Sequence, residues 1–73
     1  MSNYEHGKFT IEQDTYDKTI YLNNNYSNEI VVKLSPINKN INVYLSDVQN
    51  NYFVASKSSN EVIEVSYVVI ESE

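Results

Sequence analysis

Residues 61–71 read Glu-Val-Ile-Glu-Val-Ser-Tyr-Val-Val-Ile-Glu and form the longest β-favouring run of the sequence. Its β-branched and aromatic side chains suit a pleated surface, and neither Gly nor Pro interrupts it. With side chains alternating, Ile63, Val65, Tyr67 and Val69 share one face, and Val62, Glu64, Ser66, Val68 and Ile70 share the other. The second face is polar in its middle but apolar again at Val68 and Ile70. This run predicts a central strand whose outer face is covered over half its length.

Five shorter runs with the same alternation precede it, and segments rich in Asn, Ser or Pro separate them. They cover residues 8–12, 17–22, 29–34, 41–45 and 52–56. Pro36 is expected to end the third run, because proline cannot donate a hydrogen bond to a central ladder. Residues 57–60 are expected to form the loop of a hairpin between the last two strands. Six short strands at regular spacing predict an all-β fold, a small antiparallel β-sandwich of the Ig-like or jelly-roll-like kind.

The domain organisation follows from length and polarity. Residues 1–7 are polar and predict a flexible N-terminal arm, while residues 8–73 form a single domain. The inward positions of the strands predict one core made of Ile30, Val32, Leu34, Ile41, Val43, Leu45, Ile63, Val65, Tyr67 and Val69. A core of this size supplies only ~3–5 kcal/mol, and without cysteine no disulfide can add to it.

A second pattern appears at positions where solvent would be expected. Tyr21, Val31, Tyr44, Val62, Val68 and Ile70, joined by one of Phe53 or Val54, are apolar or aromatic on the outward side of their strands. If they gather on one sheet, they form a patch of the size that marks an interface. They therefore suggest a homo-oligomer contact. The alternative is ordinary burial of both faces of a strand within the sandwich.

The chemical inventory favours no catalytic, metal or cofactor site. His6 is the single histidine and there is no cysteine, so a Ser/His or Cys/His nucleophile is disfavoured. Glu12, Asp14 and Asp17 surround a predicted turn without the glycine of a calcium loop, and we interpret them as a solvated acidic turn. Seven tyrosines could stack on sugar rings, although strand tyrosines in the core and interface are the simpler interpretation.

The net charge of the chain limits the kinds of partner that it can bind. The chain carries −5 at neutral pH and its lysines are scattered, so nucleic acid and anionic membranes are unfavourable partners.

Four segments of the chain together carry a family resemblance. Val31-Val32-Lys33-Leu34-Ser35-Pro36 is followed by Asn42-Val43-Tyr44, then Asn51-Tyr52-Phe53-Val54, then residues 64–71. The series resembles the C-terminal β-domain of bacteriophage fibre and spike proteins, in which a "VxLSP" segment precedes "VYV", "FxV" and "VxYxV" strands. The resemblance implies a trimeric, non-enzymatic module on the virion surface, with other virion proteins and sometimes host-surface polysaccharide as partners.

Function is therefore expected to be structural. The first expectation is a virion module, from a phage head or tail fibre or a capsid decoration, that acts in assembly and in attachment to the host surface. The alternative is a small bacterial interaction protein in the cytoplasm or at the cell surface, either an adhesin-like Ig-type module or an immunity or inhibitor protein.

Overall fold

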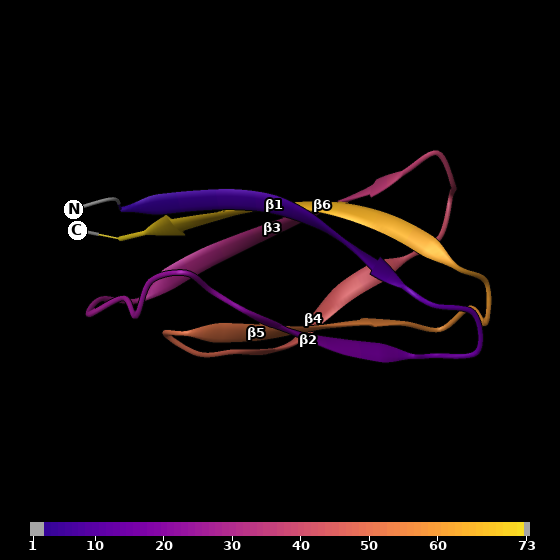
Figure 1. Ribbon diagram of the computed structural model, residues 1–73, viewed down its shortest axis with the longest axis horizontal. Helices are drawn as coiled ribbons and strands as arrows, with labels where there is room; N and C mark the ends of the chain where they lie inside the picture. The colour runs from indigo at the N-terminus through magenta and orange to yellow at the C-terminus, as the bar shows by residue number, and fades with distance from the viewer. Residues whose placement is uncertain (1–2, 73) are drawn as a thin grey trace.

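The computed structural model describes residues 3–72 and is an antiparallel β-sandwich, as predicted. Its strands are β1 (Tyr4–Ile11), β2 (Asp17–Tyr21), β3 (Ile30–Ile37), β4 (Val43–Val48), β5 (Tyr52–Lys57) and β6 (Ile63–Glu71). They form two three-stranded sheets, ordered β1-β6-β3 and β2-β5-β4, which lie one above the other in Figure 1. The first two residues of the predicted arm and the last residue of the predicted domain, residues 1, 2 and 73, lie outside the described residues.

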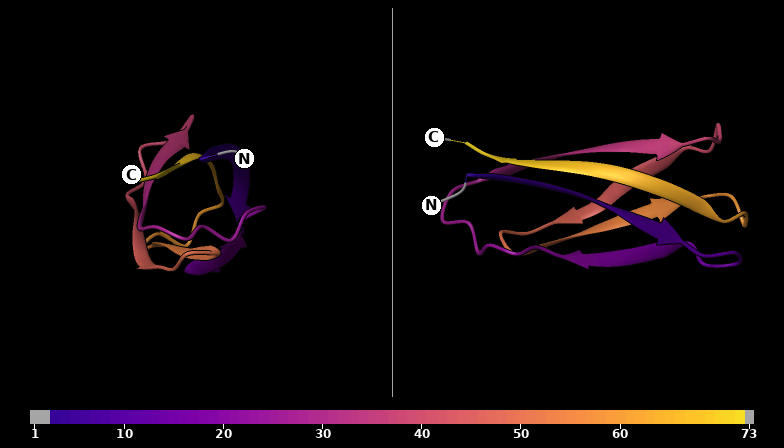
Figure 2. Two further views of the ribbon diagram at one scale, coloured as in Figure 1. Left: turned by 90° about the vertical axis from the view of Figure 1, so that its left-hand side faces the viewer. Right: turned by 45° about the horizontal axis from the view of Figure 1, so that its top comes forward.

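Strand β6 is the centre of the first sheet, which confirms the prediction made from its length and composition. It pairs with β1 on one side and β3 on the other, both antiparallel. Of the five connections, only β4 to β5 joins neighbours within a sheet, and the other four cross between layers (Figure 2). The predicted hairpin at residues 57–60 is therefore wrong. This loop carries the chain from one layer to the other.

The predicted N-terminal arm is also wrong from Tyr4 onward. Residues 4–7 belong to β1, where Tyr4 pairs with Ile70 and Gly7 pairs with Tyr67. The polar sequence did not indicate a strand because the inward residue here is Glu5. Its buried carboxylate accepts hydrogen bonds from the loop between β2 and β3 and does not depend on apolar contacts.

Proline does not end the third strand, because Pro36 lies on a free edge. The Ser72 amide donates to the Glu29 carbonyl at 2.8 Å. Hydrogen-bonded pairs alternate along an antiparallel ladder. The backbone N–H and C=O groups of the odd-numbered residues of β3 therefore point toward β6, and those of the even-numbered residues point away from β6, toward the free edge of the sheet. The missing N–H of Pro36 is thus on the side that has no partner strand. Strand β3 continues to Ile37, beyond the predicted end at Leu34.

Strands β2, β4 and β5 differ from the prediction mainly at their ends. The first ends at Tyr21 and the last extends to Lys57. Strand β4 begins two residues later than predicted and continues to Val48, because a bulge between Leu45 and Asp47 shifts the register against β5. The bulge adds one residue to β4 and reverses the side-chain alternation beyond it.

The core lies between the sheets and is more aromatic than predicted. Its buried members are Phe9, Ile11, Tyr26, Ile30, Val32, Phe53, Ala55, Ile63, Val65 and Val69. The other predicted members, Leu34, Ile41, Val43, Leu45 and Tyr67, are partly buried and pack against it. Phe53 is inward and Val54 is outward, which decides the alternative left open by the sequence. Phe9, Phe53 and Tyr67 contact one another with ring centroids 5.2–5.9 Å apart.

Candidate functional site

The six residues predicted to form an oligomer contact are all exposed, but they do not lie on one surface. Val31, Val68 and Ile70 point outward from the β1-β6-β3 sheet, whereas Tyr21 and Tyr44 point outward from the β2-β5-β4 sheet. Val62 lies in the connection between β5 and β6. The condition for a single patch, that these residues gather on one sheet, is therefore not met, since they divide between opposite layers of the sandwich. Each layer has its own candidate surface.

The first surface, the apolar cluster, consists of Tyr4, Val31, Val68 and Ile70. The register places Tyr4, Ile70 and Val31 side by side across the three strands, and Val68 follows in the next row. Each of these side chains is between 39% and 54% exposed. His6 and Lys33 flank Val68 in its row, and the row after that is polar, with Lys8, Ser66 and Ser35. The apolar cluster thus occupies one end of the outer face and has a basic border.

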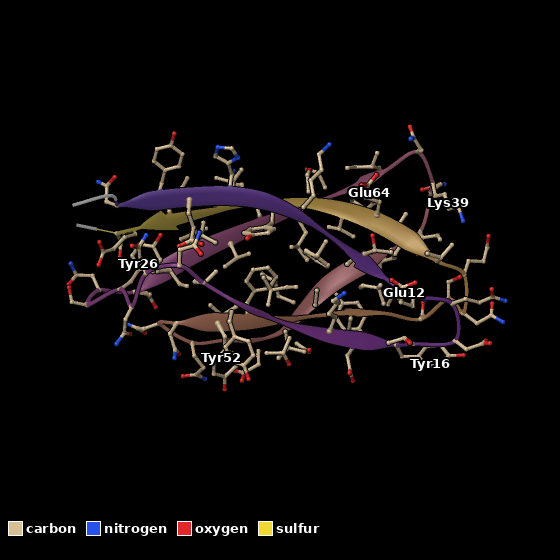
Figure 3. All side chains as sticks on the ribbon, viewed as in Figure 1. Glu12, Tyr16, Tyr26, Lys39, Tyr52 and Glu64 are labelled. Carbon is tan, nitrogen blue, oxygen red and sulfur yellow. The ribbon has the colours of Figure 1, made fainter. Side chains whose placement is uncertain are left out.

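The second surface, the tyrosine face, consists of Tyr21, Tyr44, Asp47, Gln49 and Tyr52. Tyr21 pairs with Tyr52 across β2 and β5, and their ring centroids lie 5.8 Å apart with the planes inclined at 56°. The Gln49 amide nitrogen of the backbone donates to the Tyr52 carbonyl, which places Gln49 beside them at the end of β4. Tyr52 is labelled on this side of the sandwich in Figure 3.

The β-bulge directs Asp47 onto this face. Ser46 also points outward, with its hydroxyl 2.8 Å from that of Ser56. Without the extra residue, Asp47 would point into the core after Ser46. Its carboxylate instead accepts a hydrogen bond from Gln49 Nε2 at 3.0 Å and one from the Tyr52 hydroxyl at 3.4 Å. Partial burial, together with the nearby Asp47 carboxylate, raises the pKa of Tyr52 above its usual range.

A buried carboxylate, Glu5, organises the loop between β2 and β3 next to these surfaces. It accepts hydrogen bonds from the backbone amides of Asn23 and Asn24, from Asn24 Nδ2 and from the Tyr26 hydroxyl at 2.8 Å. Burial and the adjacent Glu5 raise the pKa of Tyr26, with the Asn24 hydrogen bond acting against them. These donors make Glu5 the cap of the loop.

The same loop is held at its other end by Glu71 and Asn50. Glu71 Oε2 accepts hydrogen bonds from the Ser27 and Asn28 amides, at 3.1 and 2.9 Å. Asn50 Nδ2 donates to the Tyr26 carbonyl at 2.6 Å. An open hollow of about 400 Å³ lies beside this loop, lined by Glu29, Ile30, Val48, Gln49 and Asn50. It adjoins the tyrosine face at Gln49.

The chemistry-bearing residues singled out in the sequence do not come together. His6 is exposed and its ring stacks on Tyr4 at 6.2 Å, while Glu12, Asp14 and Asp17 are exposed. Within residues 3–72 no group of three or more His, Cys, Asp or Glu side chains is arranged to hold a metal ion.

Lys57 was predicted to lie in the hairpin loop of residues 57–60, but it is the last residue of β5 and is buried. It is 2% exposed, and its ammonium donates to the Ser59 carbonyl at 2.9 Å and lies 5.7 Å from the centre of the Tyr16 ring. Ser59 lies two residues further along the chain, whereas Tyr16 precedes β2 and comes from a segment that the sequence gives no reason to place here. A carbonyl oxygen and the face of an aromatic ring thus stabilise the buried ammonium, in place of a carboxylate.

Comparisons with known proteins leave the site to be interpreted on its own chemistry. No family model matches the chain, and neither the curated proteins nor the solved structures include a match. Across residues 3–72, the structure has no helix with the length and apolar character needed to cross a membrane.

Proposed function

We propose that this chain is a non-enzymatic structural module that associates with copies of itself through the apolar cluster. The observation that carries the proposal is the row Tyr4–Ile70–Val31, extended by Val68, on the outer face of the β1-β6-β3 sheet. Aliphatic side chains side by side on a sheet face gain about 25 cal/mol per Å² when another surface removes them from water. A domain of 73 residues with a small core benefits from that additional burial.

A second copy fits this cluster better than an unrelated charged partner. The cluster itself is uncharged, whereas its border carries His6, Lys8 and Lys33. Two copies that overlap only at their apolar ends, with the remainder of each sheet pointing away, bury the aliphatic rows and keep the lysines apart. Full stacking of the two faces in the same direction would bring lysines together. Overlap at one end is also compatible with three copies around an axis.

The setting proposed for this assembly is the surface of a virion, as part of a phage head or tail fibre or a capsid decoration. The support is the resemblance of residues 31–71 to the β-domains of such proteins, together with a fold in which strands form all the regular structure described. The same self-association would serve a bacterial interaction protein, which stays the alternative. The neighbouring genes distinguish the two, since the gene of a virion protein is expected to lie beside capsid or tail genes.

Sedimentation velocity over a range of concentrations tests the self-association. The wild type should sediment as an oligomer at high concentration, and Val68→Lys should sediment as a monomer because a lysine in the contact must be desolvated. Tyr44→Lys is the matched control, since it adds the same charge on the opposite layer. A wild type that stays monomeric at the highest concentration, or an equal effect of both substitutions, would reject the proposal.

A further inference from the structure

The tyrosine face combines exposed aromatic rings with a carboxylate fixed beside them, and we propose that it binds a neutral carbohydrate. This face belongs to the β2-β5-β4 sheet, whereas the apolar cluster belongs to the other layer. The inference therefore goes beyond self-association and does not depend on it.

The aromatic part of the face offers a stacking platform. Tyr21 is 74% exposed, the most of any large apolar side chain described, and Tyr52 lies beside it at 5.8 Å. A pyranose ring has one face formed by C–H bonds, which packs on the electron-rich face of an aromatic ring. Because the two rings are inclined at 56°, one can lie under a sugar while the other contacts its edge. Their pairing on adjacent strands places the two rings side by side without a ligand.

The polar part of the face supplies partners for sugar hydroxyls. The Asp47 carboxylate is oriented by Gln49 Nε2 at 3.0 Å and by the Tyr52 hydroxyl at 3.4 Å. An ionised carboxylate has about four lone-pair sites, so Asp47 retains acceptors for two neighbouring hydroxyls. The Gln49 side-chain oxygen adds another acceptor. Fixed polar groups beside a stacking ring provide both the orientation and the affinity that a saccharide needs.

The remaining residues of the face select against other ligands. Val54 is the single aliphatic side chain among the outward positions of β2, β5 and β4, and Thr19, Ser46 and Ser56 surround it. A dry protein interface would need a more apolar centre. Asp17 also points outward here, and Lys18 and Lys57 direct their ammonium groups elsewhere, to the Thr10 and Ser59 carbonyls. With two carboxylates and no described lysine, the face repels uronic and sulfated sugars.

Native gel electrophoresis with soluble polysaccharide in the gel tests this inference on the whole chain. The probes are a neutral glucan, a galactomannan and a xylan, with hyaluronate as the anionic comparison. At least one neutral polysaccharide should retard the wild type, and hyaluronate should not. Tyr21→Ala should weaken retardation about tenfold or more, the ratio that corresponds to a lost stacking contact of about 1.4 kcal/mol. Asp47→Asn should weaken it less, because the amide keeps one acceptor oxygen.

Two controls separate a lost contact from a lost fold. In the Val68→Lys background, which no longer depends on the apolar cluster, Tyr4→Ala removes a tyrosine that is 54% exposed on the other layer and should leave retardation unchanged. Val68→Lys should abolish self-association while each monomer still binds, so the two proposals fail independently. The inference is overturned if none of the three neutral polysaccharides retards the wild type, or if Tyr21→Ala binds as well as wild type. It is equally overturned if Tyr21→Ala converts the oligomer to a monomer, which would make the face a contact between copies.

Discussion

At the scale of single residues, Gly7 is required by space rather than by backbone conformation. A Cβ atom at this position would lie 2.8 Å from the Tyr67 hydroxyl oxygen and 3.0 Å from two ring carbons. The Tyr67 ring cannot retreat easily because it packs on Phe9 and Phe53. Gly7→Ala should therefore lower the free energy of unfolding by roughly 1–3 kcal/mol, as overpacking does elsewhere.

Urea denaturation of a double-mutant cycle checks the cause. Tyr67→Phe removes the atom closest to the added methyl group, so it should recover part of the Gly7→Ala loss. If the double variant loses as much free energy of unfolding as the two single variants together, the Tyr67 hydroxyl is not the obstacle.

The acidic turn has a conformational role that its sequence did not indicate. Asp14 has a φ of 62°, in the left-handed region, and its amide donates to the Asn60 carbonyl at 2.8 Å. Aspartate tolerates this region better than alanine, and glycine adopts it without a steric penalty. Asp14→Ala should therefore destabilise the fold by about 1 kcal/mol relative to Asp14→Gly, as measured by chemical denaturation. Asp17→Ala, an exposed position in extended backbone, serves as the control and should change stability by less than about 0.5 kcal/mol.

At the scale of elements, the strands with strict alternation were predictable and those fixed by distant partners were not. The inward face of β6 around Val65 was predictable, because apolar β-branched residues at every second position all lie on one face of a strand, and that face is buried. The first residues of β1 gave no such signal, because Glu5 is satisfied by Asn23, Asn24 and Tyr26 from a loop beyond the next strand. No local pattern reveals that pairing.

The candidate surfaces show the same division. Exposure of Tyr21 and Val68 followed from alternation, but their separation onto two layers depends on which strands share a sheet. The outward position of Asp47 depends on the bulge after Leu45, which the sequence does not mark with glycine or proline. The surfaces therefore required the topology and could not be assembled from strand patterns alone.

Two tyrosines, Tyr26 in the loop between β2 and β3 and Tyr67 in β6, predict a loss of stability in alkaline solution. Burial raises the pKa of Tyr26 above 10.0, its usual value, and raises that of Tyr67 in the same direction. The unfolded chain then releases these protons first, so the stability that they contribute is complete below about pH 10 and is lost as the pH rises through the folded-state pKa. The free energy of unfolding, measured by urea titration, should fall steeply above about pH 10.

Replacement of the two phenols identifies the source of this alkaline dependence. Tyr26→Phe also removes a donor from Glu5, so this variant should be less stable at neutral pH by roughly 1–3 kcal/mol. Its pH dependence should nevertheless be shallower than that of the wild type, and Tyr26→Phe combined with Tyr67→Phe should be shallower again. A double variant with the wild-type slope would assign the alkaline transition to other groups.

At the scale of the whole molecule, the division of apolar residues between two layers limits how much one interface can bury. A sheet of three strands with about eight residues each measures about 14 Å by about 26 Å. Only one end of the β1-β6-β3 face is apolar, so a contact between two copies falls toward the small end of specific interfaces. Association should therefore be measurable but dependent on concentration, with stability coupled to it through mass action.

Thermal unfolding checks this coupling directly. The melting temperature of the wild type should rise with protein concentration, and Val68→Lys should remove that rise while Tyr44→Lys preserves it. Because each copy carries a net charge of −5, added salt should screen the repulsion between copies and strengthen the concentration dependence. Repulsion between the lysine borders would respond to salt in the same direction, but Lys33→Gln would then strengthen association at low salt. A melting temperature that is independent of concentration at all salt levels would leave the apolar cluster as an exposed face of a monomer.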